Sequence, residues 1–442
     1  MSRLHEGLAR TAYALLLRVL LPAYVLRLWW RGRVEPPYRH AIAERFGIYR
    51  EPRSAGWVWV HAVSLGETRA AAALVDALRV ERPRMRLLLT HGTATGREAG
   101  EALLRTGDHQ TWLPFDTPGA VRRFFAQFRP AVGVLMETEV WPNLLRAAHD
   151  SGVPMVLANA RLSRRSFARG QRLAALLRPA ADSMALVLGQ TDDDAQRLRA
   201  SGARQVEVCG NLKFDLTPEP AQLAQGAAWR ACVGRDVVLA AVTREGEEAL
   251  LLAAWARRHA LGELRGALLL IVPRHPQRFD DVEALVRAAG FTLARRSHWL
   301  AEPPPDALRA DVWLGDSMRE MALYYASAHV ALLGGSFAPL GGHNLIEAAA
   351  CACPLVMGPS TFNFNEAAEL SHAAGASLRV ADMDAAVAEA LRLLRAPQEL
   401  ARRSHAALAF AARHRGAAAS MARRIVPLMR GDRRIGSSAA TP

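Results

Sequence analysis

The sequence predicts an α/β protein with two doubly wound domains, each built on a parallel sheet. Short apolar runs alternate with helical patterns from Trp57 onward, a pattern typical of strands joined by crossover helices. One polar stretch with two prolines, residues 214–225, interrupts the alternation. The 442 residues also exceed the usual size of a single hydrophobic core. We therefore expect two α/β domains of similar size with a cleft between them.

The amino-terminal segment, residues 1–33, is almost wholly apolar in its middle part, where Arg18, Pro22 and Arg27 interrupt it. A clean spanning helix needs about 20 apolar residues without such charges, and no cleavage site of a secretory signal is evident. We expect a helix, divided at Pro22, that rests on the inner face of a membrane with its arginines reaching lipid phosphates. The alternative is an apolar helix packed on the first domain.

The domain boundaries follow from the same pattern. We expect a first domain over 34–213, a linker over 214–225, a second domain with closing helices over 226–430 and a disordered tail over 431–442. Strands of the first domain are expected at Trp57–Val63, Arg86–Thr90, Thr111–Phe115, Val132–Met136, Met155–Asn159, Met184–Gly189 and Val206–Cys209. Those of the second are expected at Val237–Val242, Ala267–Val272, Phe291–Ala294, Val312–Leu314, Val330–Leu333, Pro354–Met357 and Ser377–Val380.

The turn after the first strand is the most informative segment. It contains Ser64, Gly66 and Glu67 and leads into a helix. A small-residue turn between a strand and a helix leaves free N–H groups at the carboxyl edge of the sheet, where open α/β folds bind ligands. Glu67 is therefore a carboxylate at a candidate ligand site. The alternative is an acidic residue that complements the helix dipole.

Three further loops follow strands of the first sheet and should converge with Glu67 at the same edge. They are His91–Gly96, Glu137–Asn143 and Asn159–Ser163. Two carboxylates in one loop, Glu137 and Glu139, with Arg161 near them in the next, suggest a polar acceptor site. Either glutamate could instead be a solvated surface residue.

The second domain carries two features typical of phosphate and sugar binding. The glycine-rich segment 334–347 follows a strand and runs into a helix expected to begin near Asn344, and such a loop lets the backbone approach an anion closely. Glu347 could hold ribose hydroxyls, or could close a capping box with Asn344. Arg274, followed by His275, comes directly after another strand and could bind a phosphate through its guanidinium fork.

Composition narrows the classes of partner. The net charge of +14 rests almost wholly on arginine, with Lys213 the only lysine, and such a field attracts anionic partners. No nucleic-acid-binding signature accompanies it, so nucleic acid is not an expected partner. The four cysteines lack zinc spacing. We find no DxD metal motif in a strand-end loop, because Asp192-Asp193-Asp194 opens a predicted helix and is expected to cap it. There is no GxSxG or HExxH motif. We therefore expect no metal site and no serine-hydrolase site.

Taken together, these segments resemble the 3-deoxy-D-manno-octulosonic acid (Kdo) transferases of Gram-negative bacteria. The resemblance extends from the apolar amino terminus to about Arg430. The matching segments are His61–Glu67, Thr95–Gly96, Glu137–Asn143, Gly210–Asp215, Pro273–His275 and Gly334–Glu347. Each is weak alone, whereas their combination is specific.

The resemblance implies a GT-B fold, with two Rossmann-like domains facing the cleft. It implies an inverting transfer of Kdo from CMP-Kdo to a lipid A precursor (lipid IVA) at the cytoplasmic face of the inner membrane, without a cofactor or bound catalytic metal. Glu67 matches the general base. The implied acceptor-binding residues are Ser64, Gly66, Thr95, Glu137, Glu139 and Arg161. The implied donor-binding residues are Arg274, His275, Gly315, Ser317, Met318, Ser336, Asn344 and Glu347.

Two positions depart from the family pattern. Arg319 stands where the family usually has glycine, and Arg244 stands where it usually has histidine. The first bears on the geometry of the nucleotide loop, and the second removes any direct role for a histidine at that position.

Two other functions compete with sugar transfer. One is a sugar-nucleotide epimerase or hydrolase on the same scaffold, against which stand the apolar amino terminus and the lack of a second acid–base set. The other is a non-catalytic lipid-binding protein, against which stand carboxylates at strand ends beside a nucleotide-type glycine loop. The sequence predicts neither the number of Kdo residues added nor the oligomeric state.

Overall fold

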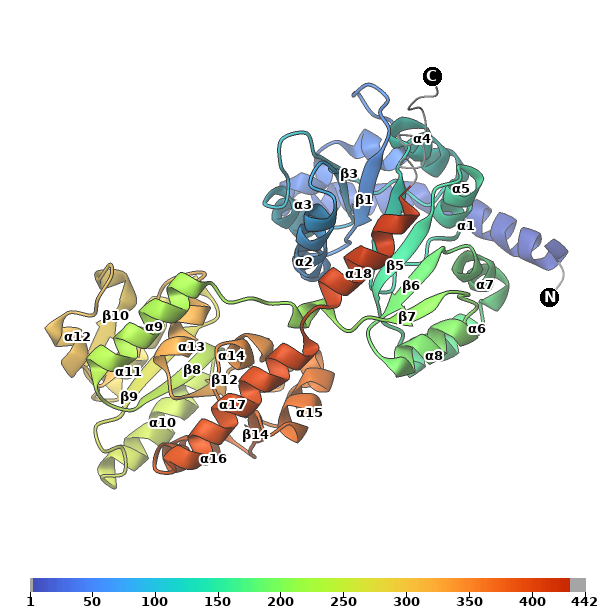
Figure 1. Cartoon of the computed structure of the whole chain (residues 1–442). Helices are drawn as coiled ribbons and strands as arrows, with labels where there is room; N and C mark the ends of the chain where they lie inside the picture. Colours follow the sequence, from blue (N-terminus) through green and yellow to red (C-terminus); the bar gives the residue numbers. More distant parts are fainter. Residues whose placement is uncertain (1–2, 430–442) are drawn as a thin grey trace, which may run out of the picture. The chain divides into compact units, whose positions relative to one another are not determined.

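The computed structural model describes residues 3–429, and the chain divides into two compact units (Figure 1). Unit 1 combines Met1–Asp215 with the carboxyl-terminal Arg415–Pro442, and unit 2 is Leu216–His414. Each unit contains one seven-stranded sheet whose paired strands all run parallel. The two predicted doubly wound α/β domains are thus present.

The sheet of unit 1 has the strand order β3-β2-β1-β4-β5-β6-β7. Its strands are β1 (Trp57–His61), β2 (Arg86–His91), β3 (His109–Trp112), β4 (Val132–Met136), β5 (Met155–Ala160), β6 (Leu186–Gly189) and β7 (Val206–Val208). Successive residues of β1 alternate between two cores: Trp57 and Trp59 enter one cluster, whereas Val58 and Val60 enter the other. A central strand buried on both faces is the expected location for such a continuous apolar run.

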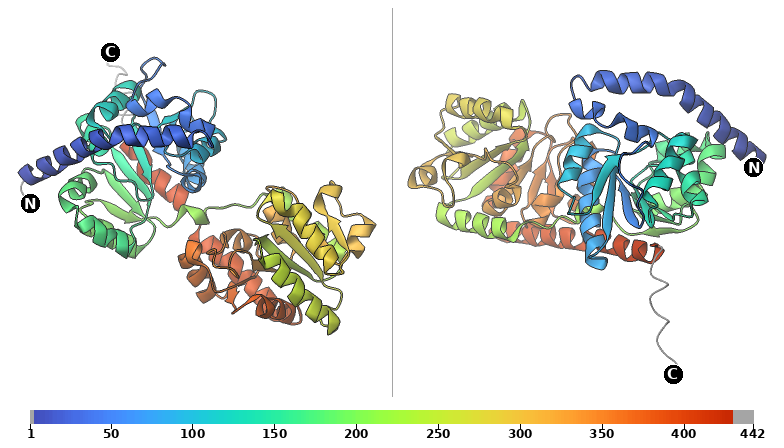
Figure 2. Two further views of the ribbon diagram at one scale, coloured as in Figure 1. Left: turned by 180° about the vertical axis from the view of Figure 1, so that it is seen from behind. Right: turned by 90° about the horizontal axis from the view of Figure 1, so that it is seen from above.

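The helices of unit 1 cover both faces of this sheet (Figures 1 and 2). They are α1 (Arg3–Arg31), α2 (Leu65–Glu81), α3 (Ala94–Glu101), α4 (Pro118–Phe128), α5 (Pro142–Asp150), α6 (Arg164–Gln171), α7 (Ala174–Asp182), α8 (Asp192–Ala200) and α18 (Ala417–Ile425), with 3₁₀ turns at Pro36–Arg39, Ile42–Phe46, Leu212–Phe214 and Val426–Leu428.

Several strands differ from their predicted ranges by one to three residues at an end, and β3 is shifted the most in unit 1. The run Thr111–Phe115 was expected to pair, but β3 begins two residues earlier, at His109. As the edge strand, β3 tolerates polar residues that a central strand would not. The Phe115 end leaves the sheet instead: its N–H donates to the Arg45 carbonyl at 2.7 Å, and its ring meets Phe46 edge-on at 5.2 Å between centroids.

The predicted domain boundaries need one correction. Residues 415–429 were assigned to the second domain, but α18 belongs to unit 1 and packs against α2. Its buried residues Met421 and Ile425 join a core of unit 1, and the Asp215 carboxylate accepts hydrogen bonds from the Gly416 and Ala418 N–H groups at the start of the helix. A carboxylate at this end offsets the unpaired donors of a helix.

The predicted linker 214–225 is likewise shorter than expected, because α9 (Pro220–Val233) already begins within it. The predicted disordered tail, residues 431–442, lies outside the described residues.

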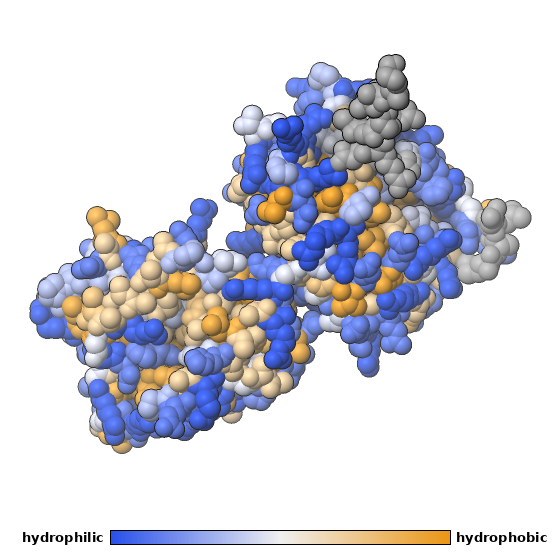
Figure 3. All heavy atoms as spheres, in the orientation of Figure 1, coloured by the Kyte–Doolittle hydropathy of each residue, from blue (hydrophilic) through white to orange (hydrophobic). Residues whose placement is uncertain are grey.

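The sheet of unit 2 has the strand order β10-β11-β9-β8-β12-β13-β14. Its strands are β8 (Val237–Thr243), β9 (Leu268–Pro273), β10 (Leu293–Arg295), β11 (Val312–Leu314), β12 (Val330–Leu333), β13 (Leu355–Met357) and β14 (Ser377–Arg379). Its helices are α9, α10 (Glu247–Ala260), α11 (Phe279–Ala288), α12 (Pro305–Arg309), α13 (Met321–Ser327), α14 (Ile346–Ala350), α15 (Asn365–Ala373), α16 (Met383–Leu394) and α17 (Pro397–His414), with 3₁₀ turns at Pro276–Arg278, Arg296–His298 and Phe362–Phe364. Hydrophilic and apolar patches alternate on the visible face of each unit (Figure 3).

The amino-terminal helix α1 is continuous through Pro22 and curves along its length (Figure 2). The expected division at Pro22 is therefore not seen, although an interior proline favours bending because it removes one helical hydrogen bond. The helix contacts α7 and α5, and the Tyr13 hydroxyl donates to Asp116 at 3.0 Å.

Most large apolar side chains of α1 nevertheless face outward. Val19 and Trp30 are 76% and 66% exposed. The segment His5–Arg31 is long and apolar enough to cross a membrane, by length and composition alone. An exposed apolar helix with interspersed arginines is typical of a membrane-associated element.

We expect a chain that lacks residues 1–33 to lose flotation with anionic liposomes, because the exposed apolar surface and the arginines of α1 leave with them. Flotation on a density gradient measures this, with circular dichroism to verify folding. A chain that lacks residues 431–442 serves as the control and should float as the full chain does. If the amino-terminally truncated chain still floats, another surface holds the membrane.

Candidate functional site

Glu67 lies in the first turn of α2, where its carboxylate closes a capping arrangement. Ser64 is the N-cap of α2, and its hydroxyl donates to Glu67 Oε1 at 3.1 Å. The Val63 N–H donates to Glu67 Oε2 at 2.8 Å. Each carboxylate oxygen can accept about two hydrogen bonds, so both keep a free lone pair. Glu67 therefore does occupy the helix terminus, as the alternative interpretation expected. Its carboxylate is nevertheless half-buried, held in one orientation and able to accept a proton.

The position of Glu67 in the sheet is that of a ligand site. Strand β1 lies between β2 and β4, so the chain leaves β1 in one direction and returns to its other side at β4. In open α/β sheets ligands bind at such a switch point, beyond the carboxyl ends of the strands. Glu67 lies in the first turn of the helix that follows β1, and the loop after β4 carries Glu137 and Glu139.

The three carboxylates repel one another. Burial raises the pKa of Glu67 above its ordinary value, with hydrogen bonds from Val63 and Ser64 opposing the rise and the Glu137 charge adding to it. Burial, reinforced by the negative charge of Glu67, raises the pKa of Glu139 to about 7. Because these charges affect one another, the segments that carry Glu67, Glu137 and Glu139 converge at one edge of the sheet, as expected. Near neutral pH the cluster can hold a proton that an isolated glutamate would have lost.

The loop after β4 is joined to the loop after β5. Glu137 has a left-handed φ of 59°, and its N–H donates to the Ala158 carbonyl at 2.9 Å. Its own carbonyl accepts from the Arg161 N–H at 3.3 Å. Positive φ is costly for a residue with a Cβ and often marks a functional turn. These bonds place Arg161, which is exposed, beside Glu137 as predicted.

Asp116 was not predicted, yet it fixes the far end of the same loop. Its buried carboxylate accepts from the Asn143 N–H at 3.2 Å and from the Leu144 N–H at 2.7 Å, so it caps α5. Burial raises the pKa of Asp116 to about 6. Tyr13 of α1 donates to the same group. The signal in the sequence was an aspartate that directly follows a strand-like run and precedes Thr117 and Pro118.

The other predicted acceptor residues are less directly involved. Gly66 is exposed, and an added Cβ would meet no neighbour closer than 3.9 Å. Thr95 is exposed at the start of α3. The missed residue there is Thr93, whose hydroxyl donates to the Val63 carbonyl at 3.0 Å and whose side chain caps α3 at the Gly96 N–H. Gly96 packs closely here, because an added Cβ would lie 3.0 Å from the Val63 carbonyl oxygen.

In unit 2, a buried glutamate organises the glycine-rich loop. Glu247, which is 1% exposed, accepts from the Gly335 N–H at 2.7 Å, the Phe337 N–H at 3.1 Å and the Arg244 N–H at 2.9 Å. It thereby ties the loop after β12 to the loop after β8, the two strands at the switch point of this sheet. Sequence reasoning noted this segment only for its departure at Arg244.

A cluster of basic residues lies at the same edge of the unit 2 sheet. Arg274 follows β9, and its N–H donates to the Thr243 carbonyl at 2.9 Å. Burial lowers the pKa of His343 to about 4, and the charges of Arg274 and Arg244 lower it further. The pKa of His275 is lowered by burial and by Arg244, Arg274 and Arg278. These mutual effects place three arginines and two histidines close together, which is typical of a site for an anion.

The segment Gly315–Met318 packs tightly. A Cβ on Gly315 would lie 2.7 Å from Val272 and 2.9 Å from Tyr324, so only glycine fits. The Ser317 hydroxyl hydrogen-bonds to the Tyr324 hydroxyl at 2.5 Å, whereas Met318 is 58% exposed. Arg319 adopts a left-handed φ of 66°, a conformation that glycine takes without strain. The departure at Arg319 thus leaves the left-handed turn in place at some cost in strain.

The remaining predicted donor-binding residues differ in how far their side chains are free to bind a ligand. The Ser336 hydroxyl is buried and occupied, because it donates to the Leu333 carbonyl at 2.5 Å and accepts from the Gly358 N–H at 2.8 Å. Asn344 Oδ1 accepts from the Ile346 N–H at 3.1 Å. The helix expected near Asn344 begins at Ile346 and has only five residues, too few for a helix-dipole site. Asn344 and Glu347 are both partly exposed.

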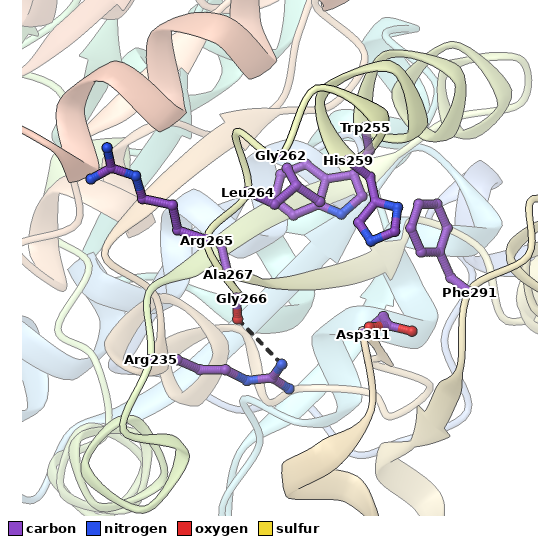
Figure 4. Close-up of a pocket in the computed structure, with 10 residues that line it drawn as sticks. All are labelled: Arg235, Trp255, His259, Gly262, Leu264, Arg265, Gly266, Ala267, Phe291 and Asp311. Carbon is purple, nitrogen blue, oxygen red and sulfur yellow. Dashed lines mark hydrogen bonds between the residues drawn. The ribbon is translucent and has the colours of Figure 1, made fainter.

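Only one of two cavities lies near the carboxyl edge of a sheet. A cavity of about 260 Å³ in unit 2 is lined by Arg235, Gly266 and Asp311 among others (Figure 4). These residues precede β8, β9 and β11, so this cavity lies at the amino edge of the sheet, away from the basic cluster. A cavity of about 270 Å³ in unit 1 reaches Glu137 and Arg161. Within residues 3–429, no group of three or more His, Cys, Asp or Glu side chains could hold a metal ion.

Comparison with known proteins gives a consistent result. The family model described as 3-deoxy-D-manno-octulosonic-acid transferase (kdotransferase) matches residues 40–216. The chain is similar to the 3-deoxy-D-manno-octulosonic acid transferase of Bordetella pertussis, with 48% identity over 423 residues that cover 93% of this chain and 97% of the relative. The chain is also 34% identical to the Haemophilus influenzae enzyme of the same name over 364 residues, which cover 81% of this chain and 84% of that relative.

Among solved structures, a glycosyltransferase from Rickettsia africae is similar in fold. Its TM-score is 0.53 at 11% sequence identity, covering 84% of this chain and 98% of that one. This likeness confirms the predicted GT-B type of fold.

The carboxylate cluster supplies a test that needs no assay of activity. Replacing Glu67 by glutamine removes a neighbouring negative charge, so we expect the pKa of Glu139 to fall below about 7. Carboxyl NMR titration of the labelled protein measures it. Glu81→Gln, at the far end of the same helix, is the matched control and should leave Glu139 unchanged. An unaltered Glu139 titration in Glu67→Gln would show that the two carboxylates do not interact.

Proposed function

This chain belongs to the Kdo transferase family and is therefore a glycosyltransferase, and on that basis we propose its specific substrates and mechanism. The protein transfers Kdo from CMP-Kdo to the lipid A precursor lipid IVA, with inversion, in the synthesis of the lipopolysaccharide core. The observation that carries this proposal is the half-buried Glu67 carboxylate, oriented at the switch point of unit 1 with a raised pKa.

On the acceptor side, Glu67 is the proposed general base. The acceptor hydroxyl attacks the anomeric carbon of Kdo, its O–H proton passes to Glu67, and the bond from that carbon to the CMP phosphate breaks with its electron pair leaving on CMP. Negative charge develops on the attacking oxygen, so a positioned carboxylate contributes about 10²–10⁴-fold. The hydrogen bonds from Val63 and Ser64 fix its direction. Arg161, together with Glu137 and Glu139, is proposed to orient the polar groups of the acceptor.

On the donor side, the basic cluster is proposed to bind CMP-Kdo. Arg274, with Arg244 and Arg278 near it, would neutralise the charge that builds on the leaving phosphate. Preorganised positive charge of this kind stabilises a transition state without reorganisation. Arginine can take the place of a divalent cation here, and we propose a metal-independent transfer. Asn344 and Glu347 are proposed to hold the nucleoside.

The proposed location is the cytoplasmic face of the inner membrane. The exposed apolar surface of α1 and the basic charge of the chain suit an anionic lipid leaflet. The acceptor, an acylated and phosphorylated disaccharide, is itself a membrane lipid.

We expect Glu67→Gln to reduce the transfer rate by a factor of about 10²–10⁴ while CMP-Kdo binding stays near that of the wild type, because glutamine keeps the shape but cannot accept the proton. Mass spectrometry of the lipid product gives the rate and also counts the Kdo residues added. Glu81→Gln is again the control. A Glu67→Gln enzyme that keeps more than about a tenth of the rate contradicts the base role. Hydrolysis of CMP-Kdo without acceptor would favour a hydrolase.

We expect EDTA to leave the transfer rate largely unchanged, because arginine side chains are proposed to neutralise the leaving phosphate. The measurement is the initial rate after dialysis against the chelator, compared with the rate after Mg²⁺ is restored. Arg274→Ala should lower the rate under both conditions. Loss of activity with EDTA that Mg²⁺ reverses would overturn the metal-free mechanism.

A further inference from the structure

The cavity of unit 1 is mostly apolar and is larger than the proposed chemistry requires. Its volume is about 270 Å³, and it lies between α6, α7, α8 and the strands β5 and β6. Val140, Phe167, Leu177, Met184 and Leu198 form much of its wall. An engineered apolar cavity of roughly 150 Å³ already excludes water and binds an apolar ligand. A larger natural cavity with such a lining is therefore suited to a hydrocarbon guest.

One end of this cavity is polar and coincides with the proposed acceptor site. Glu137, Thr138 and Arg161 contribute to its lining, and these residues come from the loops after β4 and β5. A ligand that fills the cavity would therefore present its polar part beside the carboxylate cluster. This continuity indicates one ligand with an apolar and a polar part.

Positive charge borders the cavity along α6. Arg164, Arg165 and Arg169 lie on this helix, Arg172 follows it, and all four are exposed. Within residues 3–429, none of these guanidinium groups has a carboxylate partner within 4 Å. A helix with no buried side chain of its own and several unpaired arginines favours an anionic ligand, above all a phosphate.

The opposite wall is continuous with the exposed apolar helix. α7 contributes Ala174, Leu177 and Ala181 to the cavity, and α7 also packs against α1. A hydrocarbon chain could thus pass between the cavity and the surface that α1 presents to a membrane. A cavity for a soluble sugar would have no need of such a neighbour.

We propose that this cavity binds one acyl chain of the lipid acceptor, with the phosphates of the lipid on the α6 arginines and its sugar hydroxyl toward Glu67. The inference rests on the proposed function for the identity of the lipid. Acyl binding then selects acylated acceptors, because each methylene removed from water contributes about fourfold in affinity. The enzyme would distinguish an acylated disaccharide from its deacylated form by KM.

The test fills the cavity. Ala174→Trp places an indole in the space, and Ala168→Trp, on the exposed side of α6 and outside the cavity lining, is the matched control. Exclusion of even two methylenes predicts a rise in KM for lipid IVA of about fifteenfold in Ala174→Trp. The kinetic constants for the deacylated, bisphosphorylated disaccharide should stay unchanged. An equal effect on both acceptors, or no effect on either, overturns the proposal.

A second measurement is independent of turnover and so separates this proposal from the proposed function. A fluorescent fatty acid is titrated into the full chain in detergent-free buffer, and thermal unfolding is recorded for each variant. We expect saturable binding by the wild type and by Ala168→Trp, with at least tenfold weaker binding by folded Ala174→Trp. Leu177→Ser, which makes the wall polar, should weaken binding as well. Equal binding by all four proteins would show that the acyl chain binds outside this cavity, whatever the result of the transfer assay.

Discussion

The parallel register of the strands is the constraint on which the rest of the molecule depends. Because every paired strand of unit 1 points the same way, the loops after β1, β4 and β5 leave the sheet at one edge. The strand order changes direction between β1 and β4, and ligands of open α/β sheets bind at such a switch point. Glu67 follows β1 and Glu137 follows β4. The same rule applied to β8 and β12 places Arg244 and the glycine-rich loop together in unit 2.

Unit 1 places three carboxylates close together in partly buried positions. Glu67, Glu137 and Glu139 would ionise freely if each were solvated, but partial burial and mutual repulsion raise the pKa of two of them. Such an arrangement destabilises the fold, and the surrounding structure offsets the cost with backbone donors from Val63 and with the positive end of α2. Shifted carboxylates at a switch point are a common mark of acid–base chemistry.

Unit 2 has the complementary character. Its basic residues collect at the carboxyl edge of the sheet, while its buried carboxylates bind backbone N–H groups and neighbouring side chains. Glu247 holds the glycine-rich loop, and Glu248 accepts from Thr243 at 3.0 Å and pairs with Arg278 at 3.2 Å. The two glutamates thereby hold the arginine-bearing loops in place. In the proposed transfer, unit 1 supplies the proton acceptor and unit 2 neutralises the charge on the leaving phosphate.

The sequence by itself determined the fold class and the locations of the strands, because a strand buried on both faces must be apolar and short, and helices between such strands enforce parallel pairing. It also indicated Glu67 and Arg274, since polar residues directly after such strands must lie at one edge. Only the tertiary structure decided the placement of α18, because its apolar face fits either core by composition. In the structure this face packs on α2, and Asp215 caps the start of the helix. The roles of Asp116, Thr93 and Glu247 were likewise hidden, since each acts through backbone N–H groups of loops distant in the sequence. The cavity beside α7 was hidden as well, because apolar lining residues have the same sequence pattern as a filled core.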